Sequence, residues 1–381
     1  MKVAIFGSGA AGLYTAILLK RANPSYEIHV FDKEEKLAKK LFATGNGHCN
    51  LLNKKLLPNK FNNPNFMIPI LKEFSYPVLK KEWNEMGVAL LEEGDYVYPL
   101  SYHAGSFVRY LLTLAHSIGV LFHNPCEIHD YKRSGSGYEI DSYGFFDRIV
   151  IACGGKSSPN LGSDGSFFRT LEKHGYDIRP LRPGLCPLRV KENVKVLQGI
   201  RHHALLKASN DSKQALLEEG EVLFKKDGLS GIVVFNAESA IYRSPYVKNP
   251  KISLDLFPEY SLYELCDILS RAKRNNPEDP LSSILPAPLE IYLLSLSKNK
   301  DVSSLAANLK HMVFSVSSSY DFGDSQVSIG GINVNEVSPF MESKKEKGVY
   351  FAGEVLDIDG NCGGYNLSWA FISALLISKH L

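Results

Sequence analysis

The chain opens with MKVAIFGSGAAG, residues 1–12, and this segment limits which architectures can follow it. Val3 to Phe6 is a short apolar run typical of a buried β-strand, and helix-forming residues continue from Ala10 to Arg21. Asn23-Pro24 ends that helix, and Glu27 to Phe31 is a second strand-like run. These residues predict a βαβ unit whose two strands are parallel neighbours joined by a right-handed crossover.

The glycine spacing between the first strand and the helix indicates a nucleotide-binding turn. Gly7-x-Gly9-x-x-Gly12 allows a tight turn at Gly7, close approach of a pyrophosphate at Gly9 and close helix–strand packing at Gly12. Unpaired N–H groups and the dipole at the helix N-terminus favour the diphosphate there. Asp32, 20 residues after Gly12, stands where a carboxylate accepts hydrogen bonds from ribose hydroxyls. We therefore expect a dinucleotide site rather than an ordinary glycine-rich turn.

The far end of the chain bears on the choice between NAD and FAD. The segment from Gly348 to Glu354 is a strand followed by Gly-Glu, and a turn at Gly363-Gly364 precedes an apolar helix. FAD is long enough to need such a second clamp, in which Glu354 accepts from a ribityl hydroxyl. The helix N-terminus would then face the flavin N1/C2 carbonyl edge and stabilise the negative charge that develops on reduction. These features favour FAD, and a glycine-rich turn before a core helix is the alternative.

The length of 381 residues indicates more than one hydrophobic core, at roughly 150 residues per domain. The composition of the sequence changes near Leu181, where prolines are closely spaced, and strand-like segments follow to about Phe257. A Leu-rich helical segment runs from Leu262 to Ser297, and strand-like sequence resumes at Val327, so the middle of the chain has the character of an insertion. Before it we expect two helices and a strand, at Phe66–Met86, Ala104–Ile118 and Arg148–Ala152.

Charge and cysteine content exclude several classes of protein. Lys and Arg total 43 against 41 for Asp and Glu, so no global field favours nucleic acid or an anionic membrane as the main partner. The six cysteines form no C-x-x-C pair and no zinc spacing, which predicts reduced thiols, a cytoplasmic protein and no metal. Gly7 and Gly9 interrupt the N-terminal apolar run, which argues against a signal peptide, and no other stretch is long and apolar enough to span a bilayer.

Three loop motifs carry a family resemblance. They are T-G-N-G-H-C-N from Thr44 to Asn50, G-G-K-S-S-P from Gly154 to Pro159, and F-A-G-E-V-L-D-I-D-G from Phe351 to Gly360 with G-G-Y-N-L from Gly363 to Leu367. In these motifs the chain resembles the BaiN-like NAD(P)/FAD-dependent oxidoreductases, which include aminoacetone-oxidase-type flavoproteins. The resemblance extends from the first strand to the last helix.

The resemblance implies an α/β fold in which a Rossmann-like FAD-binding domain is split in sequence. Residues 1–185 and 315–381 would form the FAD domain, 186–257 an inserted β-rich substrate or cap domain, and 258–314 a small helical domain. The expected activity is hydride transfer between FAD and a small organic substrate. NAD(P)H is the expected reductant, bound transiently at the open flavin face, because no second Gly-x-Gly-x-x-Gly unit followed by a helix is evident.

The motifs also imply a set of cofactor-binding residues. His48 stands where the family usually has Arg, and it is the candidate catalytic residue because it can donate a proton to substrate or stabilise anionic flavin. A loop histidine bonded only to the backbone is the alternative. The candidate cofactor-binding residues are Gly7, Gly9, Ala10, Ala11, Gly12, Asp32, Lys33, Lys40, Thr44, Gly45, Asn46, Gly47, Cys49, Asn50, Glu127, Ile128, Ala152, Gly154, Gly155, Gly353, Glu354, Gly364, Tyr365, Asn366 and Leu367.

The chain departs from the family pattern at three further places. Asn46 stands where Gly is usual, Tyr102-His103 stand where an acidic-Lys pair is common, and Cys362 stands where Thr is common. Cys362 could be a redox thiol beside the flavin, but a small packing residue is the simpler interpretation because no second cysteine is near in sequence.

Two other functions remain open from the sequence. One is an NAD-dependent dehydrogenase that uses the N-terminal fold for NAD. The other is a flavoprotein that binds nucleic acid, as in tRNA modification, because Arg201-His202-His203 and Lys225-Lys226 lie in the inserted part. The near-neutral net charge of +2 argues against a stable nucleic-acid partner. A folded FAD-binding protein with little turnover is a third possibility.

Overall fold

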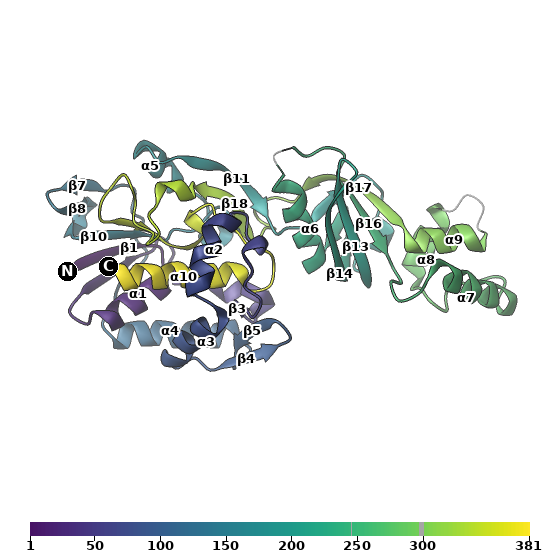
Figure 1. The fold of residues 1–381 in the computed structure, drawn as a ribbon, viewed down its shortest axis with the longest axis horizontal. Helices are drawn as coiled ribbons and strands as arrows, with labels where there is room; N and C mark the ends of the chain where they lie inside the picture. Colours follow the sequence, from purple (N-terminus) through teal and green to yellow (C-terminus); the bar gives the residue numbers. More distant parts are fainter. Residues whose placement is uncertain (245, 297–300) are drawn as a thin grey trace. The chain divides into compact units, whose positions relative to one another are not determined.

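A computed structural model describes residues 1–244, 246–296 and 301–381, without the side chains of Asn46 and Asp141. It divides into two compact units. The first combines Met1–Pro183 with Ser325–Leu381, and the second is Gly184–Asp324. The two ends of the chain therefore build one unit together (Figure 1).

The centre of the first unit is a five-stranded sheet. Its order is β19-β10-β1-β2-β6, and every neighbouring pair is parallel. The strands are β1 (Lys2–Phe6), β2 (Glu27–Phe31), β6 (Leu121–His123), β10 (Arg148–Ile151) and β19 (Val349–Phe351). Because all five are parallel, the glycine turns after β1, β10 and β19 and Asp32 after β2 lie at the same edge of the sheet. The expected Rossmann-like α/β fold is confirmed.

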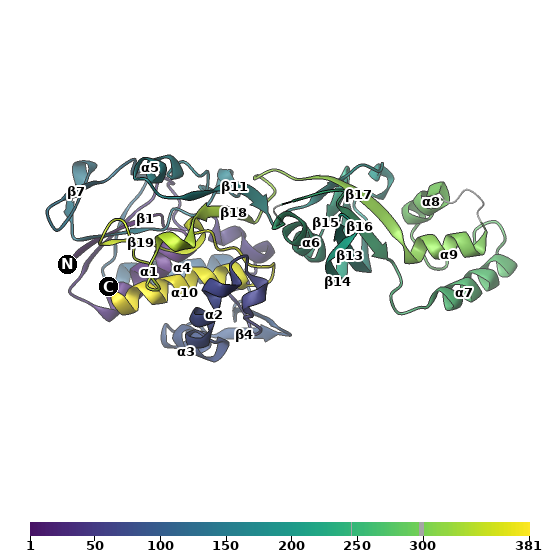
Figure 2. The same cartoon turned by 45° about the horizontal axis from the view of Figure 1, so that its top comes forward.

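Two helices from opposite ends of the chain pack together on this sheet (Figure 2). They are α1 (Ala10–Ala22) and α10 (Tyr365–His380), which matches the helix expected at the C-terminus. Trp83 stacks on Phe371 of α10 with ring centroids 4.2 Å apart, and Tyr14 of α1 meets Trp83 edge-on at 5.2 Å. These buried aromatic rings join the N-terminal and C-terminal segments in one core.

The remaining elements of the first unit surround this core. The helix expected over residues 66–86 is wrong as one element: it is broken at Phe74 and Ser75 into two helices. The helices are α2 (Pro64–Glu73), α3 (Tyr76–Glu85), α4 (Ala104–Ser117) and α5 (Phe168–Lys173). One three-stranded sheet has the order β3 (Leu52–Asn53), β5 (Tyr96–Pro99), β4 (Leu90–Glu93), and a second has the order β7 (Lys132–Ser134), β8 (Gly137–Ile140), β9 (Gly144–Phe146). The strands β11 (Ile178–Gly184) and β18 (Val327–Ile332) form a two-stranded sheet.

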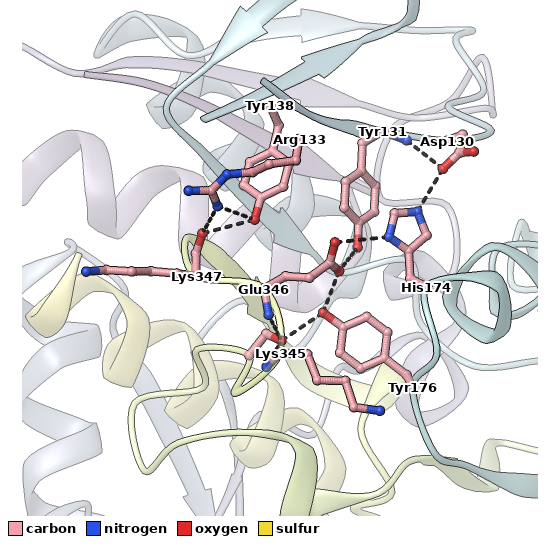
Figure 3. Close-up of polar contacts among 10 residues, drawn as sticks. Asp130, Tyr131, Arg133, Tyr138, His174, Tyr176, Lys345, Glu346 and Lys347 are labelled. Atoms are coloured by element: carbon pink, nitrogen blue, oxygen red, sulfur yellow. Dashed lines mark hydrogen bonds and ion pairs between the residues drawn. The ribbon is translucent and has the colours of Figure 1, made fainter. Parts of the chain in front are cut away.

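A polar cluster centred on His174, at the end of α5, ties three segments of the first unit together (Figure 3). His174 lies between two carboxylates: Nε2 is 2.9 Å from Asp130 Oδ1, and Nδ1 is 3.1 Å from Glu346 Oε1. Glu346 Oε2 accepts hydrogen bonds of 2.7 Å from the hydroxyls of Tyr131 and Tyr176. The cluster fastens the loop before β19 to α5 and to the strand that begins at Lys132.

The second unit is a closed six-stranded barrel with helices. Its strands are β12 (Leu188–Val190), β15 (Gly228–Ser230), β14 (Lys213–Lys225), β13 (Arg201–Asn210), β16 (Lys251–Asp255) and β17 (Met312–Ser319). Helix α6 (Ile232–Tyr242) packs on β13 and β14, although strand-like pieces were expected there. Helices α7 (Leu262–Asn275), α8 (Ala287–Leu296) and α9 (Val302–Lys310) lie between β16 and β17 in the chain.

Two of the expected domain boundaries differ from these units. The return to the first unit comes after Asp324 rather than at 315, because Met312–Ser319 is a barrel strand that pairs with β12 and β16. The helices expected as a separate domain over 258–314 share one hydrophobic core with the barrel. In that core Tyr292 of α8 stacks on Phe314 of β17 with ring centroids 6.1 Å apart.

Candidate functional site

The turn after β1 has the geometry that its glycines predict. Gly7 has φ of +100°, and a Cβ there would lie 2.5 Å from the Ala152 carbonyl oxygen. A Cβ on Gly12 would overlap the Gly7 carbonyl oxygen. A Cβ on Gly9 would meet no atom within 4 Å, and no side chain caps helix α1 at this residue. Gly9 therefore borders open space at an uncapped helix N-terminus, where an anion is favoured.

Asp32 braces this turn as well as standing at the end of β2. Its Oδ2 accepts from the backbone N–H of Ser8 at 2.7 Å and from the Ser8 hydroxyl at 2.5 Å. Its Oδ1 accepts from the N–H of Glu34 at 2.9 Å. A carboxylate has about four acceptor positions, so Asp32 keeps capacity for a ligand hydroxyl. The bond to Ser8 was not predicted, because Ser8 is an unspecified residue of the glycine motif.

Lys40, Gly155 and Glu354, which the sequence places far apart, meet at one carboxylate. Glu354 Oε1 accepts from the Ser328 N–H at 2.6 Å and from the Ser157 hydroxyl at 3.0 Å, and Oε2 is 3.1 Å from Lys40 Nζ. Lys40 also donates to the Ser157 hydroxyl. A Cβ on Gly155 would collide with the Ser328 side chain. Ser157 and Ser328, both fully buried, are therefore part of the site although neither was predicted.

The Ser328 hydroxyl links this cluster to the turn after β10. Its oxygen accepts from the N–H groups of Lys156 and Ser157 at 2.6 and 2.9 Å. Nearby, the buried hydroxyl of Ser163 has no hydrogen-bond partner among the described residues, and it lies 3.2 Å from where a Cβ of Gly154 would be. An orphaned buried hydroxyl facing a glycine turn is a position that a polar ligand atom would satisfy.

Lys33, which follows Asp32, pairs with the carboxylate of Asp164. Its ammonium pairs with Asp164 Oδ1 at 2.6 Å, and Asp164 also lines an open cavity whose cationic side chains are Lys156, Arg169 and Arg179. The lysine therefore fixes the loop after Gly162 instead of pointing freely at a ligand. Of the residues expected near an adenine, Ile128 is buried and Glu127 is exposed, and the N–H of Cys126 donates to the Asp32 carbonyl at 2.7 Å.

The segment from Thr44 to Asn53 lies against the turn that precedes α10. Gly364 has φ of +91°, and a Cβ there would lie 2.5 Å from the Leu52 carbonyl oxygen and 2.8 Å from Asn50 Oδ1. Asn53 Nδ2 donates to the Gly363 carbonyl at 2.8 Å. Two motifs about 310 residues apart in sequence are thus brought together. The side chain of Asn46 lies outside the described part of the chain.

Several predicted residues support the backbone of the site. Asn366 bonds to Gly360 and its neighbour in the turn: its Oδ1 accepts from the Gly360 N–H at 2.8 Å, and its Nδ2 donates to the Gly360 carbonyl at 2.9 Å. A Cβ on Gly353 would lie 2.6 Å from the Ala11 side chain, so α1 passes close to this turn. Burial raises the pKa of the Cys49 thiol to about 12, which keeps it protonated and unreactive.

The predicted catalytic residue, His48, contacts Tyr102, and two further tyrosines that the sequence analysis did not select, Tyr96 and Tyr98, lie on the strand that leads to Tyr102. Its ring stacks on Tyr102 with centroids 4.2 Å apart, and its Nδ1 is 3.0 Å from the Tyr102 carbonyl oxygen. Tyr98 meets Tyr102 edge-on at 4.9 Å, and a Cβ on Gly363 would lie 2.7 Å from Tyr96 Cε1. Tyr96 and Tyr98 belong to β5, whose Y-V-Y-P alternation is the signal that identifies this strand.

Cys362 lies in the turn that precedes α10, and its Sγ is 3.6 Å from Gln326 Oε1. All six cysteines are free thiols. Within the described residues, no group of three or more histidine, cysteine or acidic side chains has a geometry that could hold a metal ion. In the same part of the chain, no helix combines the length and apolar composition needed to cross a membrane.

Comparison with known proteins gives matches over the whole chain. Residues 1–380 match the family model of the HI0933-like protein Rossmann domain. A 3-dehydro-bile acid delta(4,6)-reductase of Clostridium scindens is 30% identical over 402 residues, covering 99% of this chain and 98% of that protein. A ribosomal RNA dihydrouridine synthase of Escherichia coli is 28% identical over 398 residues, covering 99% and 97%.

A solved structure shares the fold at much lower sequence similarity. The 3-ketosteroid delta1-dehydrogenase from Sterolibacterium denitrificans, in complex with 1,4-androstadiene-3,17-dione, superposes with a TM-score of 0.50 at 10% identity. The match covers 99% of this chain and 98% of that one.

Proposed function

The chain belongs to the HI0933-like Rossmann-domain family and is a flavin-dependent oxidoreductase, and we propose that it uses FAD to reduce a carbon–carbon double bond conjugated with a carbonyl group. The observation that carries the cofactor assignment is the convergence of the separate motifs at one sheet edge. The open space at Gly9 and the orphaned Ser163 hydroxyl both fit a bound dinucleotide.

The residues that would hold FAD follow from these contacts. The N-terminus of α1 would take the pyrophosphate, and Asp32 would accept from the adenosine ribose. Glu354 would accept from the ribityl chain through capacity left beside its bonds to Lys40, Ser157 and Ser328. The N-terminus of α10 would face the ring edge that gains negative charge. FAD, when bound, supplies the hydride.

The substrate class rests on the chemistry shared by two relatives. The name of the bile-acid enzyme describes reduction of double bonds at positions 4 and 6 of a 3-oxo compound. The name of the RNA enzyme describes saturation of the uracil ring of uridine, whose double bond is conjugated with a carbonyl. Both reactions add a hydride and a proton across a conjugated double bond. We propose this reaction type for the present chain, with NAD(P)H as the reductant.

The charge pattern favours a small molecule over RNA as the substrate. Residues 184–324 contain equal numbers of acidic and basic residues. Three of the five basic residues that suggested nucleic acid are paired with carboxylates: Arg201 with Glu221, His203 with Glu219 and Lys225 with Asp324. A surface for the phosphate backbone instead requires unpaired cations.

The test begins with the visible spectrum of the purified protein. We expect flavin absorbance, bleaching by NADH or NADPH without oxygen, and return of the colour when a 3-oxo-Δ4 steroid or another conjugated enone is added. A uridine-containing RNA fragment, assayed at low and high salt, is the competing acceptor. A colourless protein that does not take up FAD would refute the cofactor assignment, and reoxidation by the RNA alone would refute the small-molecule assignment.

A further inference from the structure

The hydrogen bond between His48 and Tyr102 determines where the histidine carries its proton. His48 Nδ1 is 3.0 Å from the Tyr102 carbonyl oxygen. A backbone carbonyl only accepts hydrogen bonds, so Nδ1 must be the protonated nitrogen in this contact. Neutral His48 therefore presents a bare Nε2, and charged His48 presents an Nε2–H. Because the side chain of His48 is exposed, Nε2 is the ring atom available to a ligand.

We infer that Tyr102 is a positioning residue that holds His48 in the Nδ1–H form, and that His48 Nε2 delivers the proton that completes the reduction. This inference rests on the proposed function for the reaction, but the tautomer of His48 does not. Tyr102 acts only through His48: its ring and carbonyl set the orientation of the imidazole.

The backbone fixes both partners of the pair. The His48 N–H donates to the Gly45 carbonyl at 3.0 Å, and the Cys49 N–H donates to the Thr44 carbonyl at 3.1 Å, which closes the loop around His48. Tyr102 has φ of +50°, in the left-handed region, and its N–H donates to the Pro99 carbonyl at 2.8 Å. The stacked ring and the fixed carbonyl together leave the imidazole one face and one edge for a ligand.

In the part of the chain that the structure describes, the charged and titratable groups around the pair bond to partners other than His48 Nε2. The Tyr102 hydroxyl donates to Glu93 at 3.2 Å, and Tyr98 packs edge-on against the Tyr102 ring. His103, the next residue, turns its Nδ1 to Ser106 at 3.1 Å. Among the described side chains, no carboxylate is bonded to the His48 ring. A proton on Nε2 is thus available for transfer rather than held in an ion pair.

The position of the pair suits the end of the site where the ring of FAD is proposed to lie. His48 belongs to the segment whose Asn50 lies against Gly364, directly before α10. The structure places the ring of His48 against the ring of Tyr102, 54 residues later in the chain.

The proton balance of the reaction gives each ring nitrogen of His48 a separate role. The hydride forms a C–H bond at the carbon β to the carbonyl, the π bond breaks, and its electrons move to the carbonyl as an enolate. His48 Nε2–H then gives its proton to the α carbon. The ring becomes neutral with its remaining proton on Nδ1, where the Tyr102 carbonyl already accepts it, and water returns a proton to Nε2. The histidine therefore changes charge without rotating.

The first test reads the tautomer directly, without turnover. Nitrogen-15 NMR of histidine-labelled protein, with and without FAD, should show neutral His48 protonated at Nδ1. Tyr102→Phe keeps the ring and the carbonyl and should leave this signal unchanged. Tyr102→Asn removes the ring, while asparagine tolerates the left-handed backbone, so the Nδ1–H preference should weaken. A wild-type signal from Nε2–H, or no change in Tyr102→Asn, would overturn the positioning role.

The second test separates the two half-reactions by stopped flow. In His48→Gln we expect bleaching of the flavin by NAD(P)H to stay within about twofold of wild type, whereas reoxidation by the enone falls by about 10²-fold or more. Tyr102→Asn should slow only reoxidation, and Tyr102→Phe should slow neither step. Unchanged reoxidation in His48→Gln would overturn proton delivery by His48. If no conjugated carbonyl reoxidises the wild-type flavin, the proposed function itself fails, and the NMR result still decides the role of Tyr102.

Discussion

His174 and Glu346 are joined by a hydrogen bond of 3.1 Å in which the imidazole, also bonded to Asp130, holds the loop before β19 against the end of α5. Burial lowers the pKa of His174, but the hydrogen bonds to Asp130 and Glu346 outweigh it and raise the pKa above its ordinary value. Burial raises the pKa of Asp130, but its bonds to His174 and to the Tyr131 N–H and the nearby positive charges together outweigh this and lower the pKa. The interaction between His174 and Asp130 is therefore strongest when both side chains are charged.

The first prediction concerns pH-dependent stability at this cluster. Because the pKa of His174 is raised in the folded state, the stabilisation it contributes is complete below about pH 6.5 and is lost as the pH rises through the folded-state pKa. Because the pKa of Asp130 is lowered, the stabilisation it contributes is present above about pH 4 and is lost as the pH falls further. His174→Gln should thus lower the free energy of unfolding most between these two pH limits, by about 1 kcal/mol because Asp130 is half exposed. Urea unfolding at pH 5.5 and 8.5 measures the difference. The exposed His129→Gln is the control, and equal costs for His174→Gln at both pH values would contradict the prediction.

The second prediction separates the two roles of Asp32. Asp32→Ala should weaken FAD binding about 10- to 100-fold, the range expected for loss of a charge-assisted hydrogen bond. Ser8→Ala keeps the carboxylate and removes only the hydroxyl that braces the turn, so it should affect FAD much less. Titration of the apoprotein with FAD, followed by fluorescence, gives both dissociation constants, and thermal unfolding checks the fold. Equal FAD affinity in Asp32→Ala and wild type would remove the ribose assignment.

The third prediction compares two glycines of the same motif. Gly9→Ala places a methyl group in open space and should change the free energy of unfolding by about 1 kcal/mol or less. The same methyl group should obstruct the pyrophosphate and lower FAD affinity. Gly12→Ala drives a Cβ into the Gly7 carbonyl and should destabilise the apoprotein by more than about 2 kcal/mol. If Gly9→Ala binds FAD as tightly as wild type, the space above α1 is not the phosphate position.

The fourth prediction addresses the buried serine beside Glu354. Ser328→Ala leaves the N–H groups of Lys156 and Ser157 without their acceptor, at a cost of about 1–3 kcal/mol. Ser157→Ala removes a donor to Glu354 but leaves those N–H groups bonded, so its stability cost should be smaller. Chemical unfolding of both apoproteins measures the difference. A larger loss in Ser157→Ala would show that the Glu354 cluster, rather than the turn after β10, depends on these hydroxyls.

Local sequence patterns predicted the parts of the fold that depend on neighbouring residues. The βαβ unit, the glycine turn and the last helix follow from spacing within about 30 residues. The break at Phe74 was missed because both sides of it are helical. Helix α6 was missed because Ile232 to Phe235 is rich in β-branched and aromatic residues, and its packing against β13 and β14 overrides that preference.

The site was predictable only in part for a related reason. Asp32 and Glu354 stand at the ends of recognisable strands, so their positions could be expected. Their partners could not: Ser8 is an unspecified motif residue, and Ser328 reaches Glu354 only because β18 runs beside the turn after β19. The contact of His48 with Tyr102 spans 54 residues and requires the short β4–β5 hairpin to bring the two together.

The split of the first unit between both ends of the chain has a consequence for synthesis. Gly9 and Asp32 leave the ribosome before Gly184–Asp324, and the helix that buries Phe371 against Trp83 leaves after it. The segment Gly184–Asp324 is continuous and has its own core, so it can fold before the first unit has received its C-terminal segment. Until α10 emerges, the face of α1 that packs on it has no cover. A nascent chain of this protein therefore exposes that face of α1 throughout the synthesis of Gly184–Asp324.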